Sequence, residues 1–259
     1  DEHWNIAPST FAELAGVKNT NAVDSTFRAD IFENNDSNAL WFDQQSNNQV
    51  VVDNTIVDNS GHGLAIEVSG NSIVAGNVIA ENGRDGLKLS GANAVLAYDN
   101  SIVNNGWAQV GVYADPRHSS APVTLANDIL MAGPRSIKAV LNSYDIQQPG
   151  ALPTLQMLTV DDHNLYGRTN PHRPASLAFV QTSAKVCTTY SNLTAFRSAT
   201  HRELTSASGD GWPLTKIFVN PNAGNYQVVH DAPLPAPTTL PASVAAALGT
   251  STKVSHIGA

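Results

Sequence analysis

Asparagine recurs at a nearly constant interval through the first half of this 259-residue chain. Asn35, Asn59, Asn82 and Asn105 are separated by steps of 24, 23 and 23 residues, and each is followed by a short run in which apolar residues alternate with other residues. A fixed period of this length is typical of stacked repeats, in which each unit is one supersecondary element. The period therefore constrains the fold more strongly than any other feature of the sequence.

Two further columns share this period. The polar one consists of Asp30, Asn54, Asn77 and Asn100, and the apolar one of Phe32, Ile56, Ile79 and Ile102. Asn tolerates the left-handed backbone of a sharp corner, and stacked Asn side chains can hydrogen-bond along a column. No stretch between the short runs has a helical period, which argues against alternating strands and helices. The pattern predicts an all-β fold, a right-handed parallel β-helix with three sheets per coil.

The chain divides into three expected segments. They are an N-terminal segment, residues 1–26; the β-helix, residues 27–166; and a C-terminal extension packed on the β-helix, residues 167–259. In the first segment, residues 9–16 have the outline of a helical cap. In the extension, residues 191–203 and 241–249 each predict a short helix, the former capped by Ser191 or Asn192.

Alternation along each strand assigns side chains to the core or to the outer face. Leu64 and Ile66 belong inside, so Gly63, Ala65 and Glu67 face outward. The corresponding outward residues of the neighbouring coils are Ala39, Trp41, Asp43, Gly86, Lys88, Ser90, Gln109, Gly111, Tyr113 and Asp115. The small residues predict a trough, with His62 and Arg117 at its edge, in which Trp41 and Tyr113 position a sugar ring.

Asp43 and Glu67 occupy equivalent outward positions on neighbouring coils. Adjacent strands lie about 4.8 Å apart, which predicts a carboxylate separation of roughly 5 Å. Two carboxylates at that distance cannot both ionise freely, so one pKa should rise, and Lys88 should hold Asp43 ionised. A separation of about 5–5.5 Å is the geometry of a retaining glycosidase, with one nucleophile and one acid/base.

Other interpretations of the acidic pair remain open. Outward carboxylates on a β-helix can be a solvated face, and they can bind Ca²⁺ through their oxygens, as polysaccharide lyases of this shape do. His62 can be a loop residue at a corner or an assisting group. The hydrolase hypothesis calls for no metal and no other cofactor, whereas the lyase hypothesis allows Ca²⁺.

Composition narrows the partners. The net charge of −8 argues against a nucleic-acid partner, and no run is long and apolar enough to predict a membrane span. The single cysteine excludes an internal disulfide framework. These features fit a secreted, extracellular protein that meets a carbohydrate.

The repeats over residues 27–146 resemble those of secreted bacterial parallel β-helix proteins of the pectate-lyase-like superfamily. The strand NALWFDQQ, followed one coil later by GLAIE, is similar to β-helix glycoside hydrolases of the β-xylosidase and α-L-fucosidase families. That resemblance implies Asp43 as nucleophile and Glu67 as acid/base. The string YADPRH, residues 113–118, resembles the Tyr/Asp/His cluster of mannuronan C5-epimerases.

Three hypotheses follow. The first is an extracellular retaining glycoside hydrolase. The second is a polysaccharide lyase or uronate C5-epimerase with Lys88 or Tyr113 as base, against which the scarcity of Lys and Arg in the trough counts. The third is a non-catalytic glycan-binding or structural β-helix. The acidic pair falls on the first recognisable coils, whereas related enzymes place the site mid-helix, so an N-terminal fragment of the same protein is a candidate partner that completes the trough.

Overall fold

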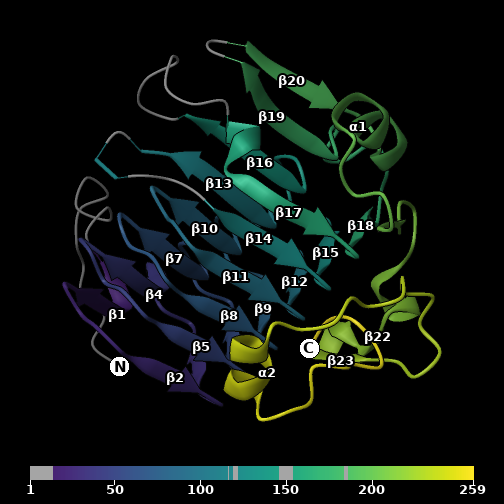
Figure 1. Cartoon of the computed structure of the whole chain (residues 1–259). Coiled ribbons are helices and arrows are strands. Elements are labelled where there is room, and N and C mark those ends of the chain that lie inside the picture. Colours follow the sequence, from purple (N-terminus) through teal and green to yellow (C-terminus); the bar gives the residue numbers. More distant parts are fainter. Residues whose placement is uncertain (1–13, 116, 119–121, 146–153, 184–185) are drawn as a thin grey trace.

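Three sheets wound around one core make up the β-helix, as the sequence predicts (Figure 1). The computed structural model describes residues 14–115, 117–118, 122–145, 154–183 and 186–259. Over most of the coils, consecutive strands enter the three sheets in turn, and we call these sheets I, II and III. Neighbouring strands within these sheets run parallel, apart from the last pair of sheet I.

The strands of each sheet follow one another in space in the order of the coils. Sheet I contains β1 (Ala15–Thr20), β4 (Asn38–Asp43), β7 (Leu64–Glu67), β10 (Leu87–Ser90), β13 (Val110–Ala114), β16 (Leu141–Asp145), β19 (Ala178–Ser183) and β20 (Val186–Tyr190). Sheet II contains β17 (Leu158–Asp162), β14 (Val123–Ala126), β11 (Val95–Tyr98), β8 (Ile73–Ala75), β5 (Val50–Val52) and β2 (Thr26–Arg28). Sheet III contains β21 (Ala207–Ser208), β18 (Leu165–Arg168), β15 (Ile129–Ala132), β12 (Ser101–Val103), β9 (Val78–Ala80), β6 (Thr55–Val57) and β3 (Ile31–Glu33).

The two polar columns form hydrogen-bonded ladders at the corners. Along the first, the amide of Asn35 donates to Asn59, that of Asn59 to Asn82 and that of Asn82 to Asn105, over 2.7, 2.8 and 2.9 Å. The second ladder runs from Asn54 through Asn77 and Asn100 to Asp128. These side chains satisfy backbone groups that the corners would otherwise leave unpaired inside the protein. The repeated asparagines therefore have a structural role, which is to hydrogen-bond the corners of successive coils to one another.

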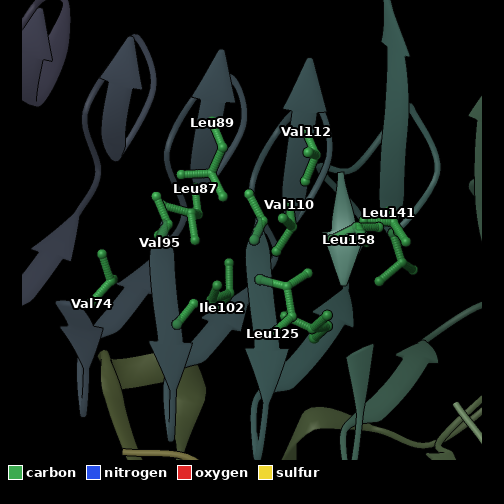
Figure 2. Close-up of a cluster of buried hydrophobic side chains, with 14 of the residues drawn as sticks. Val74, Leu87, Leu89, Val95, Ile102, Val110, Val112, Leu125, Leu141 and Leu158 are labelled. Atoms are coloured by element: carbon green, nitrogen blue, oxygen red, sulfur yellow. The ribbon is translucent and has the colours of Figure 1, made fainter. Parts of the chain in front are cut away.

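Apolar side chains from all three sheets meet inside the coils (Figure 2). The residues predicted to face inward are fully buried; they are Leu40, Phe42, Leu64, Ile66, Leu87, Leu89, Val110 and Val112. Each coil can bury these side chains only against its neighbours, so stability grows with stacking.

The strands extend beyond residues 27–166 in both directions. At the N-terminal side, β1 pairs with β4, so the first coil begins at Ala15 rather than residue 27. Ala15 and Gly16 lie in this strand, which overturns that end of the predicted 9–16 helix; residues 9–13 lie outside the described residues. Sequence reasoning missed this coil because it lacks the Asn marker of the later ones. At the other side, β18 pairs with β21.

The first expected helix of the extension closes the C-terminal end of the core. Helix α1 (Leu193–Thr200) begins after Asn192, whose side chain accepts a hydrogen bond from the Ala195 N–H. Leu193 and Phe196 are buried, and the Phe196 ring packs on Tyr190 with 5.2 Å between ring centroids. The N-cap and the inward face are those that the sequence predicts.

The rest of the described extension packs on the outer faces of sheets II and III. Helix α2 (Ala242–Leu248) covers Val52 and Tyr98 of sheet II. The hairpin of β22 (Phe218–Asn220) and β23 (Asn225–Val228) covers sheet III around Met131. Figure 1 shows both elements along one side of the coils. Short 3₁₀ helices span Thr154–Gln156, Leu214–Lys216 and Pro221–Ala223.

No helix in the described ranges has the length and apolar character needed to span a bilayer.

Candidate functional site

The outer face of sheet I carries the residues that the sequence singles out. Strand register sets them in transverse rows: Trp41 pairs with Ala65, Ala65 with Lys88, and Lys88 with Gly111. On the next residue of each strand, Phe42 pairs with Ile66. Asp43 and Glu67 follow directly after this pair and are the last residues of the neighbouring strands β4 and β7. The predicted adjacency of the two acidic positions is therefore present in the strand register.

The two carboxylates have different cationic partners. Asp43 Oδ2 lies 3.2 Å from Lys18 Nζ, and its Oδ1 accepts the Gln44 N–H at 2.8 Å. Glu67 Oε2 lies 2.9 Å from Lys88 Nζ, and Oε1 lies 2.7 Å from Arg117. Each acid thus belongs to its own ion-paired group.

Lys88 does not pair with Asp43 as the sequence indicated. Strand β7 separates β4 from β10, so the Lys88 side chain reaches Glu67 first. Burial alone would raise the pKa of Glu67, but the charges and hydrogen bonds of Lys88 and Arg117 lower that pKa overall. The sequence predicted that the pKa of one of the two carboxyl groups should rise, whereas the pKa of Glu67 is lowered.

Neither aromatic ring is the exposed platform that the sequence suggested. The Trp41 side chain is 5% exposed because Lys18 Nζ lies 3.6 Å from its ring centroid, a cation–π contact. Its Nε1–H has no hydrogen-bond partner in the described structure. Tyr113 is 4% exposed because its ring folds back over Gly111, where any Cβ would overlap it.

A buried polar group lies at the corners before β7 and β10. It consists of His62 and Asp85 from these corners and Tyr113 from β13. The Tyr113 hydroxyl donates to Asp85 Oδ2 at 3.0 Å, and the Ala108 N–H donates to Asp85 Oδ1 at 3.1 Å. His62 Nδ1 accepts the Asp85 N–H at 3.2 Å. Burial raises the pKa of Asp85 to about 6, against the opposing effect of these hydrogen bonds.

Arg117 ties the segment after β13 to the acidic pair. It contacts Glu67 and also Asp115, whose Oδ2 lies 2.6 Å from its guanidinium, which lowers the pKa of Asp115. The Arg117 side chain is half exposed, at 49%. It is therefore the charged group of this cluster most open to a ligand.

Two residues that were predicted to face outward, Gln109 and Ala39, turn instead to the corner and to the core. Gln109 turns to the corner, where its Oε1 accepts from the backbone and side chain of Asn105 and its Nε2 donates to Ser136. It ends the first ladder because no asparagine stands at that phase on the next coil. Ala39 is fully buried and joins the main core cluster, at the corner where β4 begins.

Sequence reasoning missed Lys18 and underrated Asp85. Lys18 lies on the unrecognised first coil, although it is 23 residues from Trp41, with which it pairs. Asp85 lies 23 residues after His62, so the repeat itself brings the two corners together. Extending the 23-residue repeat back from Trp41 would have identified Lys18, and applying it to the corner residues would have placed Asp85 beside His62.

Comparison with known proteins supports the fold. A family model described as "Periplasmic copper-binding protein (NosD)" matches residues 3–130, just under half of the chain. No curated protein and no solved structure matches the chain. The chain is thus NosD-like over its first coils, and its resemblance to glycoside hydrolases stays a prediction.

Proposed function

We propose that this protein is a carbohydrate-active enzyme, a retaining glycoside hydrolase that binds its substrate on the outer face of sheet I. The observation that carries the proposal is the acidic pair at the ends of β4 and β7, ion-paired within a polar cluster. The last part of the extension, from residue 214 onward, packs instead on sheets II and III. A row of acids and cations can hydrogen-bond the hydroxyl groups of a sugar.

Asp43 is the proposed nucleophile. It would attack the anomeric carbon, and its ion pair with Lys18 suits a group that must act as an anion. The Trp41 ring beside it is covered by Lys18, so it would hold that lysine next to Asp43 rather than contact the sugar.

Glu67 is the proposed acid/base residue on the basis of family resemblance. To protonate the leaving oxygen it must first carry a proton, and Lys88 and Arg117 oppose this because they lower its pKa. The scheme therefore requires that substrate draws these cations away, or that another group donates the proton.

A second candidate is proton abstraction from a uronate polymer, by a lyase or C5-epimerase. It is favoured by the cations on this face: Lys18 adds to Lys88 and Arg117, so the site is more basic than the sequence indicated. These groups could neutralise a substrate carboxylate and so acidify the neighbouring C–H. Tyr113 or Lys88 would be the base.

Copper binding, which the matching family's description names, does not fit the described residues. Their ranges contain no cluster of three or more His, Cys, Asp or Glu that could hold a metal ion. The site's own donors are carboxylates already paired with Lys and Arg, whereas copper prefers imidazole and sulfur ligands. The family description does support a location outside the cytoplasm, which suits a polysaccharide substrate.

A panel of aryl glycosides, with alginate and polygalacturonate beside it, tests the proposal. Wild type should release the aryl group from at least one glycoside, and Asp43→Asn should lower kcat at least about 100-fold, the scale of a lost catalytic group. Asp53→Asn, the same change on the sheet II side, is the matched control and should keep activity.

Two other outcomes would each support a different function. Release of unsaturated uronates without turnover of any glycoside would indicate a lyase instead of a hydrolase. Oligosaccharide binding without any turnover would indicate a non-catalytic, glycan-binding β-helix.

A further inference from the structure

One corner of the β-helix, where the chain enters sheet I, carries two exposed cations beside an aromatic ring. Arg84, Trp107 and Lys138 occupy the same position on three successive coils, because the Trp107 N–H donates to the Arg84 carbonyl and the Lys138 N–H to the Trp107 carbonyl. Arg84 Cζ lies 5.8 Å and Lys138 Nζ 5.2 Å from the centroid of the Trp107 ring. We call these three residues the corner column.

The Trp107 ring keeps both cations at the corner. An indole ring attracts a cation within about 6 Å of its centroid, so it confines long side chains that would otherwise sample many positions. The N–H groups that do not point at the ring remain available as hydrogen-bond donors. The column therefore presents two positioned donors instead of two freely moving ones.

Neither Arg84 nor Lys138 forms an ion pair with an acid among the residues that the structure describes. Both side chains are exposed. Arg135, from the same corner as Lys138, contrasts with them because it pairs with Glu81 and Asp58. The column thus carries two positive charges that the protein itself leaves without an ion-pair partner.

The acid nearest in sequence to the column is engaged elsewhere. Asp85 follows Arg84 in the chain, but its side chain is only 3% exposed. Its carboxyl accepts hydrogen bonds from the Tyr113 hydroxyl and the Ala108 N–H. An external anion that approaches Arg84 therefore does not meet this carboxylate at the surface.

The charge of the whole chain limits which anions fit. The chain has 14 Lys and Arg against 22 Asp and Glu, and its net charge of −8 opposes binding of polyanions in general. Two cations are also too few for nucleic acid, whose affinity depends on many phosphate contacts. The column is suited instead to a ligand that places a few anionic groups at defined positions.

The direction of the column selects a linear ligand. Adjacent coils lie about 4.8 Å apart, so the backbones of Arg84 and Lys138, two coils apart, are separated by about 10 Å. A ligand that contacts both cations must carry anionic groups at intervals along one line. Arg binds carboxylates through paired hydrogen bonds, and a polymer of uronic acid units offers one carboxylate per unit.

The backbone beside the column is free of side chains. Gly83 and Gly106 precede Arg84 and Trp107, and a Cβ on either would come within 2.4 Å of a carbonyl oxygen of the preceding coil. Glycine is therefore required there by the close stacking of the coils. Its consequence for the column is that no neighbouring side chain on that edge stands between the cations and a ligand.

We propose that the corner column binds a linear polysaccharide of uronic acid units, with one carboxylate on Arg84 and another on Lys138. The choice of a sugar polymer rests on the proposed function, whereas the anion site itself does not depend on catalysis. Lys88 of the sheet I site follows Arg84 by four residues, a span of at most about 14 Å. A chain held at the column therefore lies within a few sugar units of the acidic pair.

Calorimetric binding of oligogalacturonates, with neutral cello-oligosaccharides beside them, tests the column. Wild type should bind the acidic oligomers more tightly than the neutral ones, and Arg84→Gln combined with Lys138→Gln should raise the Kd for the acidic oligomers at least about tenfold. The matched control combines Lys216→Gln with Lys253→Gln. It removes two charges from the extension, where Lys216 lies 3.8 Å from the Trp212 ring centroid, and should bind like wild type. Equal weakening in both double variants, or none in either, would overturn the proposal.

Tryptophan fluorescence locates the bound oligomer. Oligogalacturonate should change the emission of wild type and of Trp212→Phe, and this change should be lost in Trp107→Phe. A response that persists in Trp107→Phe would place the ligand elsewhere and reject the column. Polyglutamate carries the same carboxylates on a peptide, and binding of it as tight as that of the oligogalacturonate would reject a sugar as the ligand.

Failure of this proposal and failure of the proposed function give different results. A wild type that binds oligogalacturonates through the column but turns over no glycoside rejects the hydrolase and keeps the column. Turnover of an aryl glycoside, with oligogalacturonate binding unaffected by the changes at Arg84 and Lys138, rejects the column alone. Circular dichroism and thermal unfolding of both double variants check that the fold is intact.

Discussion

Single carboxyl groups in this protein are set to different protonation states by their immediate partners. Glu67, between Lys88 and Arg117, has a lowered pKa. Asp85 is buried with neutral hydrogen-bond donors, and its pKa is raised to about 6. Asp128 is buried within the second ladder, and its pKa is raised to about 8. The same residue types thus serve as ion-pair partner, buried hydrogen-bond acceptor and ladder member.

Asp128→Asn should stabilise the protein. In the ladder Asp128 accepts from Asn100 through Oδ1, but its buried Oδ2 has no partner in the described structure. At the equivalent positions, the amides of Asn77 and Asn100 donate to the carbonyls of Val51 and Val74. Restoring an amide should add about 1–3 kcal/mol, measured by urea unfolding.

The gain from Asp128→Asn should grow with pH. The folded pKa of Asp128, about 8, lies above its unfolded value of about 3.9. Its contribution to stability is therefore complete below about pH 4 and is lost as pH rises to about 8. Asn77→Asp is the matched reverse change and should destabilise increasingly over that range. A gain independent of pH would contradict this account.

Lys88→Gln should raise the pKa of Glu67, because the largest favourable charge on that carboxylate is removed. Lys18→Gln, which removes the same charge from Asp43 instead, should leave the pKa of Glu67 nearly unchanged. Carbon-detected titration of the Glu67 carboxyl measures both. Equal shifts in the two variants would mean that the two ion pairs act as one.

Among the elements, the strands were the most predictable. The period places Ile56, Ile79 and Ile102 at one phase, and all three are fully buried. The prediction failed on β1, where no asparagine marks the coil. It also failed at Gln109, which was expected to face outward but turns to the corner and extends the asparagine ladder. Ion-pair partners were the least predictable part of the site, because Lys88 can reach more than one acid and only the strand order decides which.

Asn192→Ala should destabilise the protein by about 1 kcal/mol, the usual worth of an N-cap side chain. The cap matters because α1 holds Leu193 and Phe196 over the end of the core. Ser191→Ala, at the adjacent exposed position, is the control and should have little effect. Chemical unfolding of both variants measures the difference, and equal losses would argue against the cap.

On the scale of the whole molecule, the extension divides the surface of the β-helix. It packs on the outer faces of sheets II and III through Val244 and Phe218, and the polar cluster lies on sheet I. The sequence predicted an extension packed on the coils. It could not predict which sheets are covered, because that contact depends on chain segments more than 100 residues apart, such as Asn127 with Thr238.

Val244→Asp should detach α2 while leaving sheet I intact. A charge placed among Val52, Tyr98 and Leu240 opposes docking of the helix. Trypsin cleavage within residues 214–259 should accelerate at least about tenfold, which corresponds to about 1.4 kcal/mol of lost docking energy. Ser243→Asp, on the exposed side of the same helix, should cleave like wild type. Faster cleavage throughout the coils would instead indicate global unfolding.

Covalent trapping of the nucleophile tests the central claim most directly. The panel of sugars would be presented as slow-turnover glycosides fluorinated at C2, and the labelled protein digested and sequenced by mass spectrometry. The account predicts one glycosyl adduct, on Asp43 of β4, that is absent in Asp43→Asn. An adduct on a residue outside the sheet I face, or turnover of a glycoside with no adduct on Asp43, would contradict it.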